Sequence, residues 1–237
     1  MIRYRGFTKT YGGRRAVDAL TLEVPAGAVV ALLGPNGSGK TTSIKAAAGL
    51  VRPDAGDVVL GSEGLNALDA RARKTCAFLP QRVAFPEALT GREVVEMLRD
   101  LRGRGAATDE ELLDWFGESG ALDRPVRVLS GGTRQKLNAA IAFLFRPTLI
   151  ILDEPTAGLD PVASGILKDK IRRVRDGGAT VVLSSHLMAE LEELAEDLVF
   201  LVDGRVRYAG SIEGLKERAG ETGLERAMAA LLRRGSA

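Results

Sequence analysis

The sequence predicts an α/β fold in which a mostly parallel sheet is flanked by helices, with an N-terminal antiparallel β subdomain and an inserted α-helical subdomain. Three observations support this prediction. Apolar runs typical of buried parallel strands recur as VVALL, LIIL and VVL. Alternating apolar and polar residues with glycine turns precede the first run, and helical spacing dominates residues 82–145. A chain of 237 residues can bury one core of this kind.

The composition excludes several classes of protein. Hydrophobic residues make up 45% of the chain and charged residues 27%, and no 18 successive residues lack charges or helix breakers, so no membrane span is predicted. Met1 leads directly into IRYRGF without the apolar segment of a secretion signal, which indicates a cytoplasmic location. A net charge of +2 with dispersed basic residues argues against direct binding of nucleic acid. Cys76 is the only cysteine, and we expect it to pack in the core.

Residues 2–30 are expected to form antiparallel strands that lead into the first buried strand. IRYRGF and LTLEVPAG alternate between apolar and polar residues, and Gly12 and Gly13 mark a turn between them. Tyr11 lies directly before that turn. Either its ring is a half-buried part of the strand, or it is exposed and stacks on a purine.

The stretch VVALLGPNGSGKTT, residues 29–42, places a glycine-rich turn between an apolar strand and a helix. It fits the phosphate-loop pattern G-x-x-x-x-G-K-[ST]. Glycines allow backbone N–H groups to face a polyphosphate, the helix directs its positive dipole end at that charge, and Lys40 reaches the β and γ oxygens. Thr41 is then placed to ligate Mg²⁺. The expected nucleotide-binding residues are Gly34, Pro35, Asn36, Gly37, Ser38, Gly39, Lys40, Thr41 and Thr42.

Residues 42–81 continue the α/β pattern. We expect a helix over residues 42–50, a strand at DVVLG, a short helix at residues 69–74 and a strand at CAFLPQ, which ends at Gln81. Ligands of open α/β sheets gather at the carboxyl ends of strands, which makes Gln81 a candidate site residue. Residues 82–146 then form the inserted helical subdomain, where Thr90 caps one helix and Trp115 is expected to belong to the core.

Residues 129–145, LSGGTRQKLNAAIAFLF, predict an alanine-rich helix that Ser130 caps and that ends before Pro147. Because Gly131 and Gly132 leave backbone amides uncovered, the helix start is a second candidate anion site. An ordinary capped helix is the simpler alternative.

The run LIIL, residues 149–152, predicts a buried strand that ends at Asp153 and Glu154, close to the phosphate loop. Two carboxylates would repel a polyphosphate unless a cation lay between them. We therefore expect Asp153 to bind Mg²⁺, and Glu154 to orient and deprotonate an attacking water. Asp160 is expected to cap the following helix.

His186 is the only histidine of the chain and follows the apolar run of ATVVLSSH, at the same edge of the sheet. This position favours a contact with a phosphate over a structural role. Residues 197–209 predict a hairpin around Asp203 and Gly204. Residues 211–237 predict C-terminal helices whose apolar stripe packs on the domain, with a dimer contact as the alternative.

In this order, the motifs resemble those of the nucleotide-binding subunit of an ABC transporter over essentially the whole chain. The resemblance rests on GPNGSGKT as Walker A, Gln81 as the Q-loop glutamine, LSGG as the signature, LIILDE as Walker B, AGLD as the D-loop and His186 as the switch histidine. It implies a single ATPase domain over residues 1–237. Within this domain, residues 1–81 and 147–210 form the P-loop NTPase core, and residues 82–146 form the helical subdomain.

The resemblance further implies that two such domains meet head to tail around two ATP molecules. Ser130, Gly131 and Gly132 would then contact the γ-phosphate bound to the partner, Tyr11 would stack on adenine, and Asp160 would couple the two sites. Gln81 would link Mg²⁺ and the attacking water to a groove that receives a membrane subunit. Integral membrane subunits would hold the protein at the inner face of the cell membrane. Hydrolysis would depend on Glu154 as the base, with Lys40 and His186 at the γ-phosphate.

The chain is similar to ABC-2 type export ATPases, since the stretch before LSGG is short and we expect one or two C-terminal helices without an added regulatory domain. FLPQRVAFPEALTGREVVE and LSGGTRQKLNAAIAFLF also resemble ATPases that accompany nitrous oxide reductase maturation and copper-site assembly. Thr133 departs from the Gln or Met of many members but leaves the Ser-Gly-Gly amides intact. Two alternatives remain: an ABC ATPase outside transport, for example in iron-sulfur assembly, and a module that holds ATP without hydrolysis. The complete set of Lys40, Asp153, Glu154 and His186 argues against the second.

Overall fold

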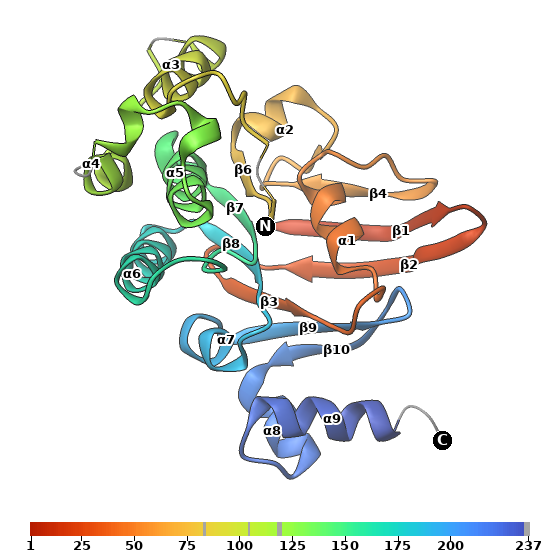
Figure 1. The fold of residues 1–237 in the computed structure, drawn as a ribbon. Helices are drawn as coiled ribbons and strands as arrows, with labels where there is room; N and C mark the ends of the chain where they lie inside the picture. Colours follow the sequence, from red (N-terminus) through yellow and green to blue (C-terminus); the bar gives the residue numbers. More distant parts are fainter. Residues whose placement is uncertain (83, 104, 118–119, 235–237) are drawn as a thin grey trace.

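The computed structural model describes residues 1–82, 84–103, 105–117 and 120–234, which form two sheets with helices packed on them (Figure 1). Residues 83, 104, 118–119 and 235–237 belong to the expected helical and C-terminal segments and lie outside the described residues. Within the described ranges, no helix is both long and apolar enough to cross a membrane.

The first sheet is antiparallel and has the strand order β2-β1-β4-β5. Its strands are β1 (Ile2–Tyr11), β2 (Arg14–Val24), β4 (Ala55–Leu60) and β5 (Leu65–Asn66). Gly12 and Gly13 join β1 to β2 with φ angles of 54° and 80°, a conformation that side chains with a Cβ disfavour. The predicted N-terminal antiparallel subdomain is thereby confirmed.

The second sheet has the order β10-β9-β3-β8-β7-β6 and is parallel except for β10 at its edge. Its strands are β3 (Val29–Leu33), β6 (Cys76–Leu79), β7 (Leu149–Asp153), β8 (Thr180–Ser184), β9 (Asp197–Val202) and β10 (Arg205–Ser211). Because β3, β6, β7 and β8 run in the same direction, their carboxyl ends meet at one edge. The residues that follow these strands are therefore brought together.

Helix α1 (Lys40–Ala47) lies between the two sheets, where Ile44 shares a core with Tyr4 of β1 and Leu32 of β3. The helix ends before the expected Leu50. The reason is Gly49, which has a φ of 71° and approaches Ala67 so closely that a Cβ would lie 2.3 Å from its carbonyl oxygen. The short helix α2 (Ala70–Lys74) precedes β6 and is capped by Asp69.

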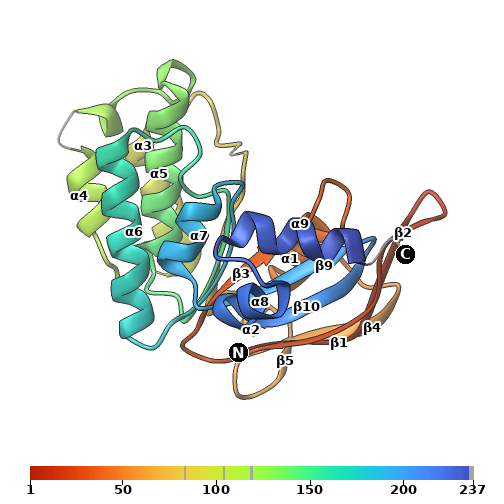
Figure 2. The same ribbon diagram turned by 90° about the horizontal axis from the view of Figure 1, so that it is seen from below.

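The other face of the parallel sheet is covered by helices that share a second core. These are α5 (Gly131–Leu144), α6 (Pro161–Asp176), α7 (Met188–Leu194), α8 (Ile212–Ala219) and α9 (Leu224–Arg234). Helices α3 (Gly91–Arg102) and α4 (Glu111–Gly117) gather beside α5 and form a helical lobe at one end of the molecule (Figure 2). As predicted, Thr90 caps α3, and Trp115 is partly buried against Phe116.

The buried thiol of Cys76 on β6 gives a first test of the fold. Burial raises the pKa of this thiol to about 12, so almost no thiolate forms at pH 8. We expect a thiol reagent such as DTNB to leave the folded protein unlabelled at pH 8. In a urea series, labelling is expected to rise together with the loss of circular dichroism. Rapid labelling without denaturant would contradict the burial of Cys76.

Candidate functional site

A cleft of about 390 Å³ opens at the edge where the parallel strands end. Residues 36–42 of the phosphate loop form one wall of the cleft. The remaining lining residues are Ala16, Gln81, Asp153, Glu154 and His186. The structure therefore brings together five of the predicted site residues that are far apart in the sequence, Lys40, Gln81, Asp153, Glu154 and His186.

Glycines 34 and 39 allow the phosphate loop to adopt its conformation. Gly34 has a φ of 151°, and a Cβ there would lie 2.2 Å from the carbonyl oxygen of Leu201. Gly39 has a φ of 100°, and its Cβ would lie 2.6 Å from the carbonyl oxygen of Ala16. Because backbone atoms occupy both positions, a larger residue would force the loop to move.

The turn between β9 and β10 supports the phosphate loop through backbone hydrogen bonds. The N–H of Gly204 donates to the carbonyl oxygen of Ser38 at 3.0 Å, and the N–H of Asp18 donates to the carbonyl oxygen of Gly204 at 3.0 Å. A Cβ on Gly204 would lie 2.9 Å from the carbonyl oxygen of Ala16. The phosphate loop, β2 and the β9–β10 turn are thus held as one unit.

Lys40 begins α1, and no side chain caps this helix or places an acid in its first turn. The free N–H groups and the helix dipole therefore face the cleft without an internal anion. The Nζ atom of Lys40 donates to the carbonyl oxygens of Gly34 at 2.5 Å and of Pro35 at 3.1 Å. Burial lowers the pKa of Lys40, while the carboxylates of Asp153 and Glu154 oppose this effect.

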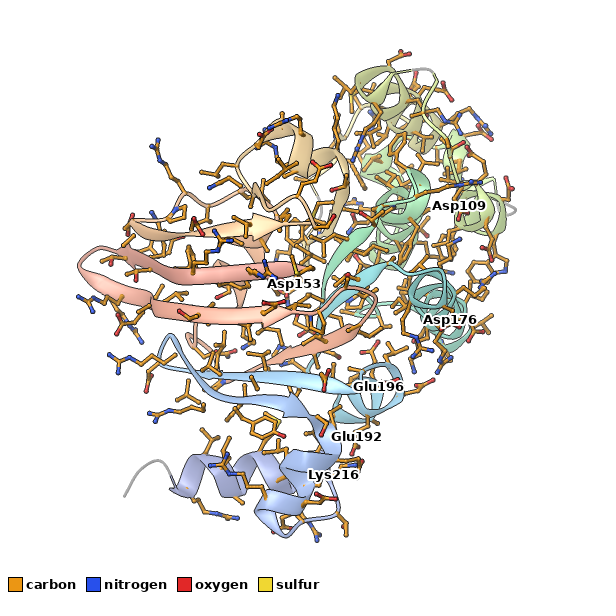
Figure 3. All side chains as sticks on the ribbon, turned by 180° about the vertical axis from the view of Figure 1, so that it is seen from behind. Asp109, Asp153, Asp176, Glu192, Glu196 and Lys216 are labelled. Atoms are coloured by element: carbon orange, nitrogen blue, oxygen red, sulfur yellow. The ribbon has the colours of Figure 1, made fainter. Side chains whose placement is uncertain are left out.

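Asp153 ends β7 and is labelled near the centre of the view in Figure 3. The hydroxyl of Ser184, at the end of β8, donates to Asp153 Oδ1 at 2.6 Å and fixes the carboxylate. Across the described residues, no three His, Cys, Asp or Glu side chains are grouped to hold a metal ion. The fixed carboxylate of Asp153 fits Mg²⁺, which binds through one or two carboxylates together with substrate phosphates. Thr41 and Gln81 line the same cleft, and their side chains carry oxygen donors of the type that Mg²⁺ prefers.

Glu154 has a φ of 55°, a strained conformation for a residue with a side chain and one that occurs at functional sites. Its Oε2 accepts the N–H of His186 at 3.2 Å, and its Oε1 lies 3.3 Å from His186 Nε2. Burial raises the pKa of Glu154. The charge and the backbone N–H of His186 oppose this effect, and repulsion from Asp153 and Glu190 adds to it. The site therefore pairs a mostly buried carboxylate with an exposed imidazole.

Comparison with known proteins assigns this arrangement to a family. The family model for ABC transporters matches residues 17–157, which include the phosphate loop and both strand-end acids. The chain belongs to the ABC transporter family. It is an ATP-binding and ATP-hydrolysing subunit of this family.

Two curated relatives are similar to this ABC ATPase over most of its length. Daunorubicin/doxorubicin resistance ATP-binding protein DrrA of Streptomyces peucetius is 38% identical, over 92% of this chain and 68% of its own. The phospholipid-transporting ATPase ABCA7 of Homo sapiens is 39% identical over 92% of this chain, which spans 10% of that longer protein.

Two solved structures have the same fold as the ABC ATPase. An ATP-binding subunit of an ABC transporter superposes with a TM-score of 0.88 at 28% identity and covers 98% of this chain and 99% of its own. A dimeric post-hydrolysis state of the ATP-binding cassette MJ0796 bound to ADP and Pi has a TM-score of 0.80 at 26% identity, over 89% and 98% of the two chains. These matches confirm the predicted P-loop NTPase fold.

The remaining candidate residues of the ABC ATPase lie outside the cleft. Ser130 caps α5 by accepting the N–H of Thr133 at 3.1 Å, and the α-carbon of Gly132 faces the carbonyl oxygen of Gly158. Asp160 caps α6, as predicted, and forms an ion pair of 2.7 Å with Lys136. Within one chain, the signature motif therefore contacts the D-loop and does not line the cleft around Lys40.

Tyr11 lies at the end of β1, where its side chain is exposed to 50%. A half-exposed ring at the end of a strand fits both expectations for Tyr11, so the structure does not decide between them. Lys9 Nζ lies 5.6 Å from the centre of the ring, and Arg14 is the cross-strand partner of Tyr11. The exposed ring is accessible for stacking on a base.

Sequence analysis missed three residues near the cleft. Ser184 fixes Asp153, and the rule that site residues follow parallel strands could have identified it. Arg14 places its Nη2 3.9 Å from the position of a Cβ on Gly37, a proximity that depends on the register of the β1–β2 hairpin. Glu190 is buried on α7, although a charged residue type in a helix predicts an exposed side chain.

Proposed function

We propose that this ABC ATPase powers an exporter, with two copies that close head to tail over ATP and membrane subunits that follow the closure. One observation supports this proposal above all: Lys40, Asp153, Glu154 and His186 share a cleft, whereas Ser130 and the D-loop lie outside it. A site of this kind is completed when a second copy supplies the N-terminus of its α5.

In this proposal, the loop amides and Lys40 bind the triphosphate of ATP, and Tyr11 stacks on adenine. Glu154 accepts a proton from the attacking water, while His186 contacts the γ-phosphate and keeps Glu154 in place. Asp153, Thr41 and Gln81 would hold Mg²⁺. When bound, the ion neutralises charge on the β- and γ-phosphate oxygens.

The second copy contributes the rest of the site. Ser130, Gly131 and Gly132 would direct backbone amides and the start of α5 at the γ-phosphate bound to the partner. Asp160, two residues after Gly158, would carry a change in one site to the other. The dimeric MJ0796 structures, of which one holds ADP and Pi, support this arrangement.

The names of the relatives support export. DrrA is described as a daunorubicin/doxorubicin resistance protein, and ABCA7 as a phospholipid-transporting ATPase. In this proposal, the membrane subunits choose the cargo. The protein would then sit at the inner face of the membrane through these subunits.

Site-specific crosslinking tests the proposed membrane partner. A photoreactive amino acid replaces exposed Arg82, next to Gln81, and a control variant carries it at exposed Glu63 in the β4–β5 connection. After irradiation of cells that produce the protein, we expect Arg82 but not Glu63 to crosslink to an integral membrane protein. A soluble scaffold captured at Arg82 would instead favour the iron-sulfur assembly alternative and contradict the proposal.

A further inference from the structure

Glu190 on α7 is a buried carboxylate that the proposed reaction does not use. Its side chain is 2% exposed, although carboxylates are rarely buried without a specific partner. Its Oε1 has no hydrogen-bond partner in the part of the chain that the structure describes. The burial of Glu190 therefore depends on the partners of its other oxygen.

The other oxygen of Glu190 joins the two loops that carry the reactive side chains. Glu190 Oε2 accepts the hydroxyl of Ser185 at 2.6 Å and the hydroxyl of Thr156 at 3.0 Å. Ser185 directly precedes His186, and Thr156 follows Glu154 by two residues. A single carboxylate oxygen therefore sets the spacing between the residue-154 loop and the residue-186 loop.

Helix α5 also contacts the residue-154 loop. The amide of Gln135, 7% exposed, donates to the carbonyl oxygen of Pro155 at 3.0 Å. Helix α5 is the helix that Ser130 caps. Buried polar groups thus form a continuous path from α5, through Pro155 and Thr156, to Glu190 and the residue-186 loop.

We propose that Glu190 is a positioning residue for ATP hydrolysis. Its carboxylate holds the residue-154 loop and the residue-186 loop together, so that Glu154 and His186 keep the spacing that turnover requires. The inference rests on the proposed roles of Glu154 and His186. A glutamine could accept the same hydroxyl donors, but hydrogen bonds to a charged acceptor are about twice as strong, so the charge makes this spacing stiffer.

Kinetics of four variants test this role. Glu190→Ala removes the contact, and Glu190→Gln keeps the shape but removes the charge. The matched controls are Glu192→Gln and Glu193→Gln on the exposed side of α7, where Glu192 pairs with Lys216 at 2.7 Å and lies beside it in Figure 3. The measurements are kcat and KM for ATP, the Kd of ATP at equilibrium and the thermal unfolding midpoint.

We expect Glu190→Ala to lower kcat by about 100-fold, as small misplacements of reacting groups do. Glu190→Gln should restore about a tenth of the wild-type kcat, since it keeps two weaker hydrogen bonds. The Kd of ATP should stay near the wild-type value in both variants, because the phosphate loop is untouched. The two controls should match the wild type in every measurement.

Normal kcat in both Glu190 variants would overturn the inference, and so would a loss confined to the Kd of ATP. If Glu190→Ala fails to fold, Thr156→Val and Ser185→Ala replace it. Each should lower kcat, and in combination with Glu190→Gln the losses should be less than additive, because all three side chains share one contact. Additive losses would contradict the shared contact. A wild-type protein without ATPase activity would instead overturn the function on which the inference rests.

Discussion

Glu154→Gln is expected to lower the turnover number for ATP by about 10²- to 10⁴-fold, the usual contribution of a general base. Glutamine has almost the same shape and still accepts the N–H of His186, which the Glu154 carboxylate accepts at 3.2 Å. It cannot take a proton from water. ATP should therefore bind with near wild-type affinity, and the ATP-bound dimer should last longer because hydrolysis no longer reopens it. Phosphate release and light scattering measure the two effects.

Glu193→Gln is the matched control for this variant, because it removes a carboxylate from an exposed ion pair on α7. It should leave turnover and dimer lifetime unchanged. Normal turnover in Glu154→Gln would exclude Glu154 as the base. Weak ATP binding in the same variant would show that Glu154 contributes to the binding of ATP and not to the hydrolysis step.

Lys40→Ala is expected to weaken ATP binding by about 10- to 100-fold, the range for loss of a hydrogen bond to a charged group. In the protein as described, Lys40 Nζ donates to two loop carbonyls, of Gly34 and Pro35. The ammonium therefore already lies inside the loop where phosphate oxygens would replace these acceptors. Lys40→Arg should not restore binding, since the larger planar guanidinium does not fit the same space. Equilibrium titration with a fluorescent ATP analogue measures the loss.

A mixing experiment separates a shared site from one within a single chain. Lys40→Ala disables the phosphate loop, and Ser130→Phe blocks the start of α5 that would face the partner. Each variant alone should have little ATPase activity. In a heterodimer of the two, one site keeps both Lys40 and Ser130, so the mixture should recover part of the activity. Absence of recovery, with heterodimers verified by two different tags, would contradict the head-to-tail arrangement.

Much of the site could be predicted from the sequence because each part has a strong local signal. The phosphate loop fits a specific pattern, and the apolar runs before Asp153 and His186 identify strands that end at one edge. Thr90, Ser130 and Asp160 cap helices as their residue types indicate. These signals require only neighbouring residues, and the structure confirms the strands, their shared edge and the three helix caps.

Features that depend on several distant segments could not be predicted in this way. Glu190 stands in the stretch MAELEEL, where its charge and the glutamate three residues later, Glu193, suggest an exposed helix face. Its burial results from contacts with Thr156 and Ser185, which only the packed fold brings together. The order of the strands, with β8 between β3 and β7, likewise depends on tertiary packing.

The hydrogen bond from Gly204 to Ser38 has a practical consequence for protein engineering. A glycine hairpin at the surface is an attractive place to insert an epitope tag or a fluorescent protein. In this chain, an insertion between Asp203 and Gly204 would displace the backbone that supports the phosphate loop from behind. Such a fusion could be abundant and folded and still bind ATP poorly. Labels are better attached in the β4–β5 connection near Glu63, where the chain is exposed and on the antiparallel sheet.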